Sequence, residues 1–416
     1  MKFLYSITLV LSLYSLHFGK AEVATTNNQL ALKLYYHLAK TSDGDFLFSP
    51  FSLSSLISVL GSLAGEGTVE RITGAMDYAD DYESITNDYK RILIEFQKLE
   101  SLNETVMELQ QKDDLKLSTD FKRLLVKYLF DISPLKFAAG SKAQNEEDNY
   151  LTTILNLGNQ TETDIDQLIQ LKSTINFKGS WARPFNPITT QPSPFYNMSR
   201  RPYLVDMMFQ RMEVPYAEID SLDCTAIALP YRLNYTSSDE PESRVELLVF
   251  LPNSITGLQD LETKLVQQPF SLTLREFTGT KDLFVYMPKF KLRSELDLKS
   301  ALRQVGLHSL FVSENSNFSK LFQGNVKPKA FGVLKASHFG KFSVDEYGTN
   351  GWARGFLGSQ PAITKHLSPD VFRVDRPFVG VLYDSIRHMV LLMFRKIDFE
   401  SIDPNRIAIP DAFQTE

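Results

Sequence analysis

The spacing of apolar side chains divides the chain into a helical first third and a strand-rich remainder. Leucine recurs at every fourth position from residue 30 to residue 38, which predicts a helix with one buried face behind the candidate N-caps Thr26 and Asn27. Residues 49–65 are apolar on most sides and predict a buried helix. Residues 118–130 predict a third helix, because their apolar positions also share one face.

Strand patterns dominate after this helical part. The continuous apolar run at 245–252 is typical of a strand that is covered on both faces. Residues 282–292 are rich in β-branched and aromatic side chains, with Pro288 interrupting the ladder. A helix over 296–306 should end at Gly306. Three further strands are expected at 331–344, 371–384 and 389–398. Helices that run into strands without a linker predict a single α+β domain.

The segment between the expected strands at 331–344 and 371–384 has neither a helical nor a strand pattern. It runs from Val344 to Pro369 and contains four glycines together with Trp352 and Arg354. A connection of this length without secondary structure is unusual in a compact domain, where it is either functional or disordered. The segment is therefore the first candidate for a functional part of the chain.

The N-terminus has the pattern of an export signal. A short basic start precedes an apolar stretch at 3–16, and small residues follow at Gly19, Ala21 and Ala24, where a peptidase could cut. The stretch is short for a membrane span, and the sequence has no second candidate span. We therefore expect residues 1–21 to be a cleaved signal peptide of a protein secreted to the extracellular space. The alternative is a membrane anchor.

Secretion gives meaning to the Asn-x-Ser/Thr sequons, because N-glycans are added to exported proteins. The glycosylation candidates are Asn103, Asn159, Asn197, Asn234 and Asn317. The alternative is that several of these short sequons occur by chance and carry no glycan.

Composition and charge narrow the function classes. The chain has 416 residues, of which 43% are hydrophobic and 23% charged, as in ordinary soluble globular proteins. Its net charge of −6 leaves no basic excess to neutralise phosphates, so we expect no nucleic-acid partner. The single cysteine, Cys224, excludes an internal disulfide and a thiolate metal cluster. We also expect no membrane partner and a monomer.

Motifs that carry enzyme chemistry are absent from the sequence. It contains no G-x-S-x-G, H-E-x-x-H, P-loop or G-x-G-x-x-G motif, so we expect no enzyme, no catalytic residue, no metal and no cofactor. His338 is expected to be a structural hydrogen-bonding group, and Cys224 a buried, inert thiol in a strand-like run. The acidic stretch at 77–83 is interpreted as a solvated loop rather than a calcium site. The segment 88–104 has no basic face for a heparin-type cofactor.

Short motifs along most of the chain resemble those of the serpin family. SPFSLSSL at 49–56 resembles the opening of a buried helix in that family, and INFKGSW at 175–181 resembles its Phe-Lys-Gly-x-Trp strand end. His338, eight residues before Glu346, matches the histidine that precedes the family's hinge. Further matches in the family's order are VDMM (205–208), ALPY (228–231), VFLP (249–252), MPKFKL (287–292), QVGLHSLF (304–311), SNFS (316–319) and DRPFVGVLYD (375–384). Their joint order over roughly residues 27 to 404 is highly specific.

The resemblance implies a serpin-like α+β fold with three β-sheets, eight or nine α-helices and an exposed reactive centre loop. It implies one domain over residues 25–404 and a C-terminal tail at 405–416. The implied function is a secreted serine-type endopeptidase inhibitor, with a serine protease of unknown class as partner. Such an inhibitor is a suicide substrate: the protease cuts the loop, and the cut loop inserts into the main sheet as a new strand. The alternative is a non-inhibitory serpin, such as a carrier, ligand or signalling protein.

VDEYGT at 344–349 matches the family's Glu-x-Gly-Thr hinge, from which an inserting loop starts. The hinge residues implied by this match are Glu346, Gly348, Thr349, Gly351 and Ala353. Because side chains alternate along a strand, these last three would face inward with Gly355, and all are small. Trp352 and Arg354 would face solvent, although inhibitory serpins usually carry small residues on both faces. Glycine also weakens a strand by roughly 0.5–1 kcal/mol relative to alanine. Both hypotheses therefore stay open.

The bond attacked by a protease is placed by family spacing. Counting from Glu346 gives Ala362–Ile363 as the reactive bond, with Lys365–His366 as the runner-up. Ala362 would suit an elastase-like protease, and Lys365 a trypsin-like one.

Four positions depart from the family's usual pattern. Asp45 replaces an asparagine, Ser173-Thr174 replace small and amide residues before Phe-Lys-Gly, and Phe394 replaces a glycine of the final strand. The sequence leaves open whether these changes are harmless or accompany a loss of inhibition.

Overall fold

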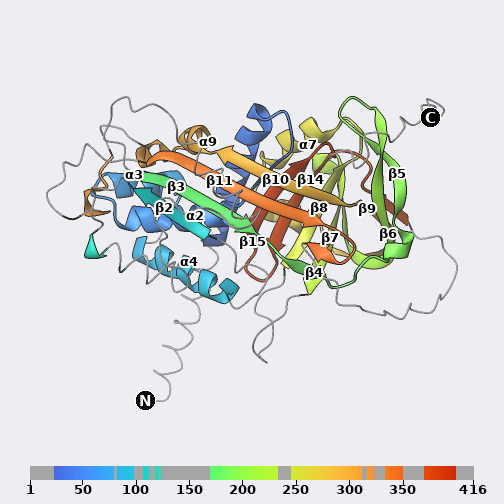
Figure 1. The fold of residues 1–416 in the computed structure, drawn as a ribbon, viewed down its shortest axis with the longest axis horizontal. Helices are drawn as coiled ribbons and strands as arrows, with labels where there is room; N and C mark the ends of the chain where they lie inside the picture. The colour runs from blue at the N-terminus through green and yellow to red at the C-terminus, as the bar shows by residue number, and fades with distance from the viewer. Residues whose placement is uncertain are drawn as a thin grey trace, which may run out of the picture.

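The computed structural model describes the chain in several ranges: 23–78, 82–97, 106–111, 118–120, 123, 169–232, 245–311, 316–321, 323, 333–349 and 370–399. Long strands cross the molecule, and three helices lie together at one end of them (Figure 1). These helices are α2 (Pro50–Ser62), α3 (Thr68–Met76) and α4 (Tyr82–Gln97).

The strands of the main sheet in the described residues are β2 (Val106–Gln111), β3 (Ile169–Asn176), β4 (Gly179–Trp181), β10 (Phe290–Asp297), β11 (Val333–Val344) and β12 (Gly348–Thr349). β11 pairs antiparallel with β10 and parallel with β3, and β2 pairs antiparallel with β3. β3 and β11 run side by side across the front of Figure 1. β3 and β11 are therefore a parallel pair inside a mostly antiparallel sheet, and they come from parts of the chain that are far apart in sequence.

The other strands form two further groups, joined to the main sheet through β6 and β7. One group contains β1 (Phe46–Phe48), β15 (Met389–Lys396), β14 (Phe378–Asp384), β8 (Val245–Pro252) and β7 (Cys224–Arg232). The other contains β5 (Gln191–Tyr196), β6 (Pro202–Ile219), β9 (Gly279–Pro288) and β13 (Asp370–Arg373). Every residue of β8, β14 and β15 is buried, because these strands lie at the centre of the core.

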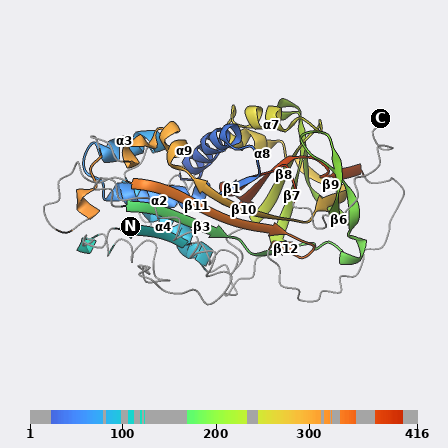
Figure 2. The same ribbon diagram turned by 45° about the horizontal axis from the view of Figure 1, so that its top comes forward.

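The described residues contain further helices. They are residues 23–41, α7 (Leu258–Leu265), α8 (Phe270–Arg275) and α9 (Lys299–Gln304). Short 3-10 turns follow at η1 (Pro187–Thr189), η2 (Asp220–Leu222), η3 (Leu307–Leu310) and η4 (Ser319–Leu321). α7 packs against β8 and β14, as the turned view shows (Figure 2). Over the described ranges, no helix has the length and apolarity needed to cross a bilayer.

Most of the predicted elements are confirmed. The buried helix at 49–65 is α2, and the strand at 245–252 is β8. β9 ends at Pro288 and β10 begins at Phe290, so the expected strand at 282–292 is two strands. The prediction of N-caps at Thr26 and Asn27 is wrong, because the chain is already helical at residue 23.

Both of these polar side chains instead bond within the core. The Thr26 hydroxyl donates to the Val23 carbonyl, and the Asn27 amide donates to the carbonyl of Val390, 2.8 Å away. Most of the predicted helix at 118–130 lies outside the described residues. The expected totals of three sheets and eight or nine helices stay predictions.

The unusual phenylalanine of the final strand is accommodated by a glycine on the next strand. Phe394 of β15 pairs directly with Gly380 of β14. A Cβ atom at Gly380 would lie 2.0 Å from the Phe394 ring, so the ring occupies the space above the glycine backbone. This departure is therefore compatible with a well-packed core.

Candidate functional site

In the main sheet, β11 pairs directly with β3 but is separated from β4, which continues β3 along the chain. β3 and β4 are two halves of the same stretch of chain, interrupted at Phe177 and Lys178. β3 pairs directly with β11, whereas β4 is separated from β11 by β12, which pairs with both. We call the line along which β11 faces β3 and β4 the seam. The short β12 lies in its opened end (Figure 2).

The chain enters the seam through a tight reversal, and we call residues 345–349 the hinge. Asp345 forms the turn, because its carboxylate accepts the N–H groups of Tyr347 at 2.8 Å and Gly348 at 3.1 Å. Gly348 has a φ of 151°, and a Cβ atom there would lie 1.9 Å from the carbonyl oxygen of Gly179. Only glycine therefore fits where the hinge approaches β4.

Glu346 fastens the hinge to two other segments. Its buried carboxylate accepts hydrogen bonds from Lys289 Nζ at 2.9 Å and from the Thr190 hydroxyl at 2.8 Å. Burial by itself would raise the pKa of Glu346, but these hydrogen bonds outweigh it, and the pKa lies below its usual value. The backbone is held too, since the Phe185 N–H donates to the Glu346 carbonyl at 2.8 Å. The hinge glutamate is therefore a charged anchor at physiological pH.

Two aromatic side chains from neighbouring strands hold the rest of the hinge. The Trp181 indole N–H donates to the Asp345 carbonyl at 2.9 Å, and the Trp181 ring stacks on Tyr231 with 4.4 Å between centroids. The Tyr231 hydroxyl lies 2.6 Å from the hydroxyl of Thr349, which is completely buried. Thr349 is thus already buried in the intact protein, and the inward alternation of the residues after it stays a prediction. The roles of Trp181 and Tyr231 were not predicted, although both belong to motifs that carry the resemblance.

The closed part of the seam contains two buried polar atoms for which the described residues supply no partner. His338 on β11 and Ser173 on β3 are paired residues of the ladder, and both are almost inaccessible to solvent. The His338 Nε2 atom accepts the Ser49 N–H at 3.1 Å. Within the described residues, neither His338 Nδ1 nor Ser173 Oγ has a hydrogen-bond partner.

His338 is the structural hydrogen-bonding group that the sequence predicted. Burial lowers its pKa to about 3, so the ring is neutral at physiological pH. Its neutral Nε2 is the acceptor that orients the N-terminus of α2 against the sheet.

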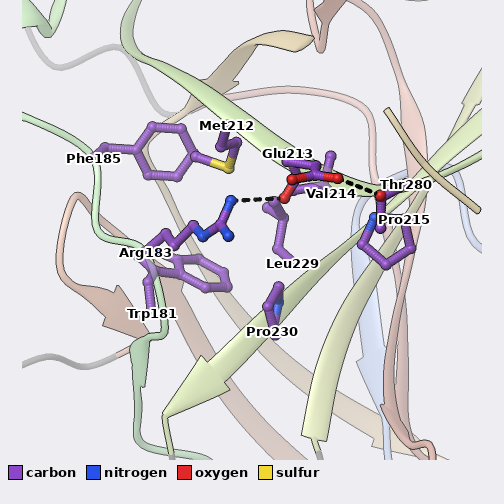
Figure 3. A pocket seen from close by; sticks show the side chains of 10 residues that line it. All are labelled: Trp181, Arg183, Phe185, Met212, Glu213, Val214, Pro215, Leu229, Pro230 and Thr280. Atoms are coloured by element: carbon purple, nitrogen blue, oxygen red, sulfur yellow. Dashed lines mark hydrogen bonds between the residues drawn. The ribbon is translucent and has the colours of Figure 1, made fainter. Parts of the chain in front are cut away.

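A pocket of about 270 Å³ lies next to the hinge, between the end of β4 and strands β6 and β7 (Figure 3). Its lining residues are Trp181, Arg183, Phe185, Met212, Glu213, Val214, Pro215, Leu229, Pro230 and Thr280. Trp181 and Phe185 therefore contact the hinge and also line this pocket.

The remaining hinge and loop predictions fall on residues that are not described. The structure describes three of the hinge candidates, Glu346, Gly348 and Thr349, each of which contacts a neighbouring segment, and their role as a hinge stays a prediction. Outside the described ranges lie the hinge candidates Gly351 and Ala353, the loop residues Trp352 and Arg354, and the candidate reactive bonds at Ala362–Ile363 and Lys365–His366.

Two of the five glycosylation candidates can be placed. Asn197 lies at a turn between β5 and β6, next to exposed residues, and its side-chain oxygen accepts two backbone N–H groups. Asn317 packs against Gly65, where a Cβ atom would lie 2.3 Å from its amide nitrogen. The candidates Asn103, Asn159 and Asn234 lie outside the described residues.

The described residues allow the predictions for Cys224 and for a metal site to be examined. Cys224 is buried, and burial raises the pKa of its thiol to about 12, which confirms the predicted inert thiol. The described ranges contain no group of three or more His, Cys, Asp and Glu side chains that could hold a metal ion.

Comparison with known proteins relates this geometry to one family. A family model described as Serpin (serine protease inhibitor) matches residues 25–398. The chain is 25% identical over 404 residues to leukocyte elastase inhibitor A of Mus musculus, with 90% of this chain and 98% of the mouse protein covered. It is 27% identical over 401 residues to intracellular coagulation inhibitor 1 of Tachypleus tridentatus, with 91% and 89% covered.

Solved structures share the same fold. The structure of Serpin48 from the insect Tenebrio molitor superposes with a TM-score of 0.71 at 21% identity, covering 91% of this chain and 98% of that one. The structure of the mouse protein-Z dependent protease inhibitor gives a TM-score of 0.71 at 20% identity, covering 92% and 100%. The family match spans most of the sequence, and the chain therefore belongs to the serpin family of serine protease inhibitors.

Proposed function

We propose that this serpin is a secreted inhibitor of serine proteases that acts as a suicide substrate. The observation that carries the proposal is the position of β12 between β4 and β11. A loop that is cut beyond Thr349 would extend β12 along the seam as a new central strand. Separating β3 from β11 is the step that admits it.

The free energy for trapping a protease would come from new backbone hydrogen bonds. A strand between two others pairs on both edges, as in known cases of strand addition. At about 1 kcal/mol net per bond, a dozen or so inserted residues would release on the order of 10–20 kcal/mol. The intact protein is then metastable, and the direct pairing of β3 with β11 forms part of the barrier.

The loop sequence is compatible with this route. Thr349 already occupies an inward position, and the next inward positions, Gly351 and Ala353, are small. Trp352 and Arg354 would alternate onto the solvent face. We propose Ala362–Ile363 as the reactive bond, which would suit an elastase-like protease, and the similar mouse protein is named as an inhibitor of leukocyte elastase.

Secretion and glycosylation complete the proposal. Residues 1–21 would be removed as a signal peptide ahead of the single domain at 25–404. Of the two sequons in described residues, Asn197 is the better acceptor, because it lies at a turn whereas Asn317 is packed against Gly65. A similar protein is named as intracellular, so secretion needs its own test: detection of the cleaved, glycosylated chain in the medium of expressing cells.

Incubation with elastase-like, trypsin-like and chymotrypsin-like proteases tests the mechanism. We expect one of them to form a complex that survives SDS, and mass spectrometry of the released C-terminal peptide identifies the reactive bond. A Thr349→Arg variant should be cut without forming this complex, because a buried cation beside Tyr231 blocks entry into the seam. If cleavage of the wild type gives no complex and no rise in thermal stability, the protein is a non-inhibitory serpin.

A further inference from the structure

The pocket beside the hinge has the size and lining of a small-molecule site. Its volume of about 270 Å³ exceeds the roughly 150 Å³ of an apolar cavity known to bind benzene, so a molecule of one or two rings fits. Its apolar floor is formed by the buried side chains of Met212, Val214 and Leu229 (Figure 3). The aromatic rings of Trp181 and Phe185 supply flat walls. Aromatic ligands suit such walls.

Two oppositely charged side chains line the pocket, those of Arg183 and Glu213. Arg183 points into the pocket, and among the described residues its guanidinium group donates one hydrogen bond, to the Glu213 backbone carbonyl at 3.0 Å. A guanidinium has five N–H donors and binds carboxylates in a bidentate manner, so donors remain for a ligand. The Glu213 carboxylate instead accepts the Thr280 hydroxyl at 2.6 Å. We propose that the pocket binds a small aromatic carboxylate, with its ring between Trp181 and Leu229 and its carboxylate on Arg183.

Trp181 and Phe185, which form walls of the pocket, also bond to the hinge, so ligand binding there is coupled to insertion of the loop. Trp181 donates its indole N–H to Asp345, and Phe185 donates its backbone N–H to Glu346. A ligand in contact with both rings fixes them in the arrangement of the intact protein. Insertion, which rests on the proposed function, extends β12 past this end of β4 and parts β3 from β11. The bound carboxylate therefore favours the intact form and slows insertion, and by linkage insertion weakens its binding.

Fluorescence of Trp181 gives a direct binding test. Trp181 and Trp352 are the two tryptophans of the chain, so a Trp352→Phe variant reports on the pocket wall alone. The probe is 4-iodobenzoate, whose iodine quenches a contacting indole, and the neutral control is 4-iodobenzyl alcohol. We expect saturable quenching by 4-iodobenzoate with a Kd on the order of 0.1–1 mM, and at least about tenfold weaker binding of the alcohol, because it lacks the charge-assisted bonds.

Paired variants locate the site. In the Trp352→Phe background, Arg183→Gln should weaken 4-iodobenzoate at least about tenfold and leave the alcohol unchanged. Arg211→Gln is the matched control, because Arg211 is an exposed arginine of β6 outside the pocket lining. Leu229→Phe fills the apolar floor and should weaken both probes. Quenching that does not saturate, or that responds equally to Arg183→Gln and Arg211→Gln, overturns the site.

The coupling is tested by comparing the intact protein with protein cleaved in its loop. We expect the cleaved form to bind 4-iodobenzoate at least about fivefold more weakly. Equal affinities in a cleaved protein whose unfolding temperature has risen overturn the coupling. A cleaved protein without that rise overturns insertion, and the coupling with it. The proposed inhibitory function fails on a different result, the absence of an SDS-stable complex with each protease.

Discussion

At the end of β15, buried polar and charged groups are engaged, whereas at the seam two buried polar atoms, His338 Nδ1 and Ser173 Oγ, have no partner among the described residues. We call the first region the clasp; it consists of Asp45, Glu262, Arg395 and Lys396 with the carbonyl groups that they contact. Arg395 donates to the carbonyls of Ala39, Ser42 and Gly44 at the end of the helix over 23–41. The clasp thus ties the last strand to the first helix.

Each charge in the clasp has a counter-charge. Arg395 lies 3.6 Å from Glu262, whose carboxylate also accepts the hydroxyl of Tyr35. Lys396 pairs with Asp45, and the other Asp45 oxygen accepts the backbone N–H of Ile397 at 2.7 Å. This explains the departure at Asp45: it pairs with a lysine that lies almost completely inside the protein.

The two regions differ in how firmly their side chains hold neighbouring segments together. Removing one member of a buried, fully paired set leaves charges unsatisfied, so the clasp resists separation. Ser173 and His338 make no hydrogen bond to each other across the seam, so parting β3 from β11 breaks no side-chain bond there. Under the proposed function, the seam is the line that opens.

The largest expected effect is in the clasp. Arg395→Met should lower the free energy of unfolding by about 3–5 kcal/mol, because Glu262 and three carbonyl groups lose their partner inside the core. Urea unfolding of the purified variant measures the loss. The control is Arg211→Met, which removes an exposed pair with Asp282 and should cost less than about 1 kcal/mol. Similar losses for the two variants would contradict the assignment of the clasp.

The second effect concerns pH at the seam. The pKa of His338 is lowered to about 3, whereas an unfolded histidine has a pKa near 6.5. The unfolded state therefore binds the extra proton between these values. The stabilising contribution is fully present above pH 6.5 and is lost as pH falls toward 3, by about 1.4 kcal/mol per pH unit.

His338→Gln should remove this component of the pH dependence. Glutamine can still accept the Ser49 N–H but does not titrate. Urea unfolding at pH 7.5, 6 and 5 compares the two proteins, so that the titrations of other groups cancel. Parallel pH profiles for the wild type and the variant would show that the neutral histidine is not the titrating group.

The elements that the sequence predicted correctly are those with a local signal. The run at 245–252 is apolar at successive positions, and α2 is apolar on most sides, so burial on all faces could be read from the neighbours in the chain. Gly306 could be identified as a helix stop because a left-handed residue after a helix favours glycine, and its φ is 94°. Resemblance to a family added the position of the hinge.

The contacts of the site could not be predicted, because they join residues far apart in sequence. Trp181 and Asp345 are separated by 164 positions, and Tyr231 and Thr349 by 118. No periodicity relates such pairs. The departure at Ser173 was visible in the sequence, but its consequence depends on the register that places it opposite His338.

A moderate effect is expected from a substitution that adds a hydrogen bond between positions 173 and 338 across the seam. Ser173→Asn introduces a longer amide, of the kind usual in serpins just before Phe-Lys-Gly, which can donate to His338 Nδ1. The intact protein should gain about 1 kcal/mol in stability, measured as a higher urea midpoint. The loop-cleaved protein should gain nothing, because an inserted strand would then separate the two residues. Ser173→Ala is the control that removes the hydroxyl without offering a bond.

The smallest expected effect tests whether burial or a short contact distance determines how much an ion pair stabilises the fold. Asp370 of β13 accepts from Lys281 at 2.6 Å, a shorter contact than the 3.6 Å between Arg395 and Glu262. However, 65% of the Asp370 side chain is exposed, against 7% for Glu262. Water and salt screen an exposed pair, so Asp370→Asn should change the free energy of unfolding by no more than about 0.5 kcal/mol.

The salt dependence of stability is a second test of the Lys281–Asp370 pair. Raising the salt concentration should remove the remaining difference between Asp370→Asn and the wild type, because an exposed pair is screened over about 10 Å at 0.1 M. The loss caused by Arg395→Met should persist, since the clasp lies in the core. If Asp370→Asn were as costly as Arg395→Met, distance rather than burial would determine the strength of these pairs, and the contrast between clasp and surface would fail.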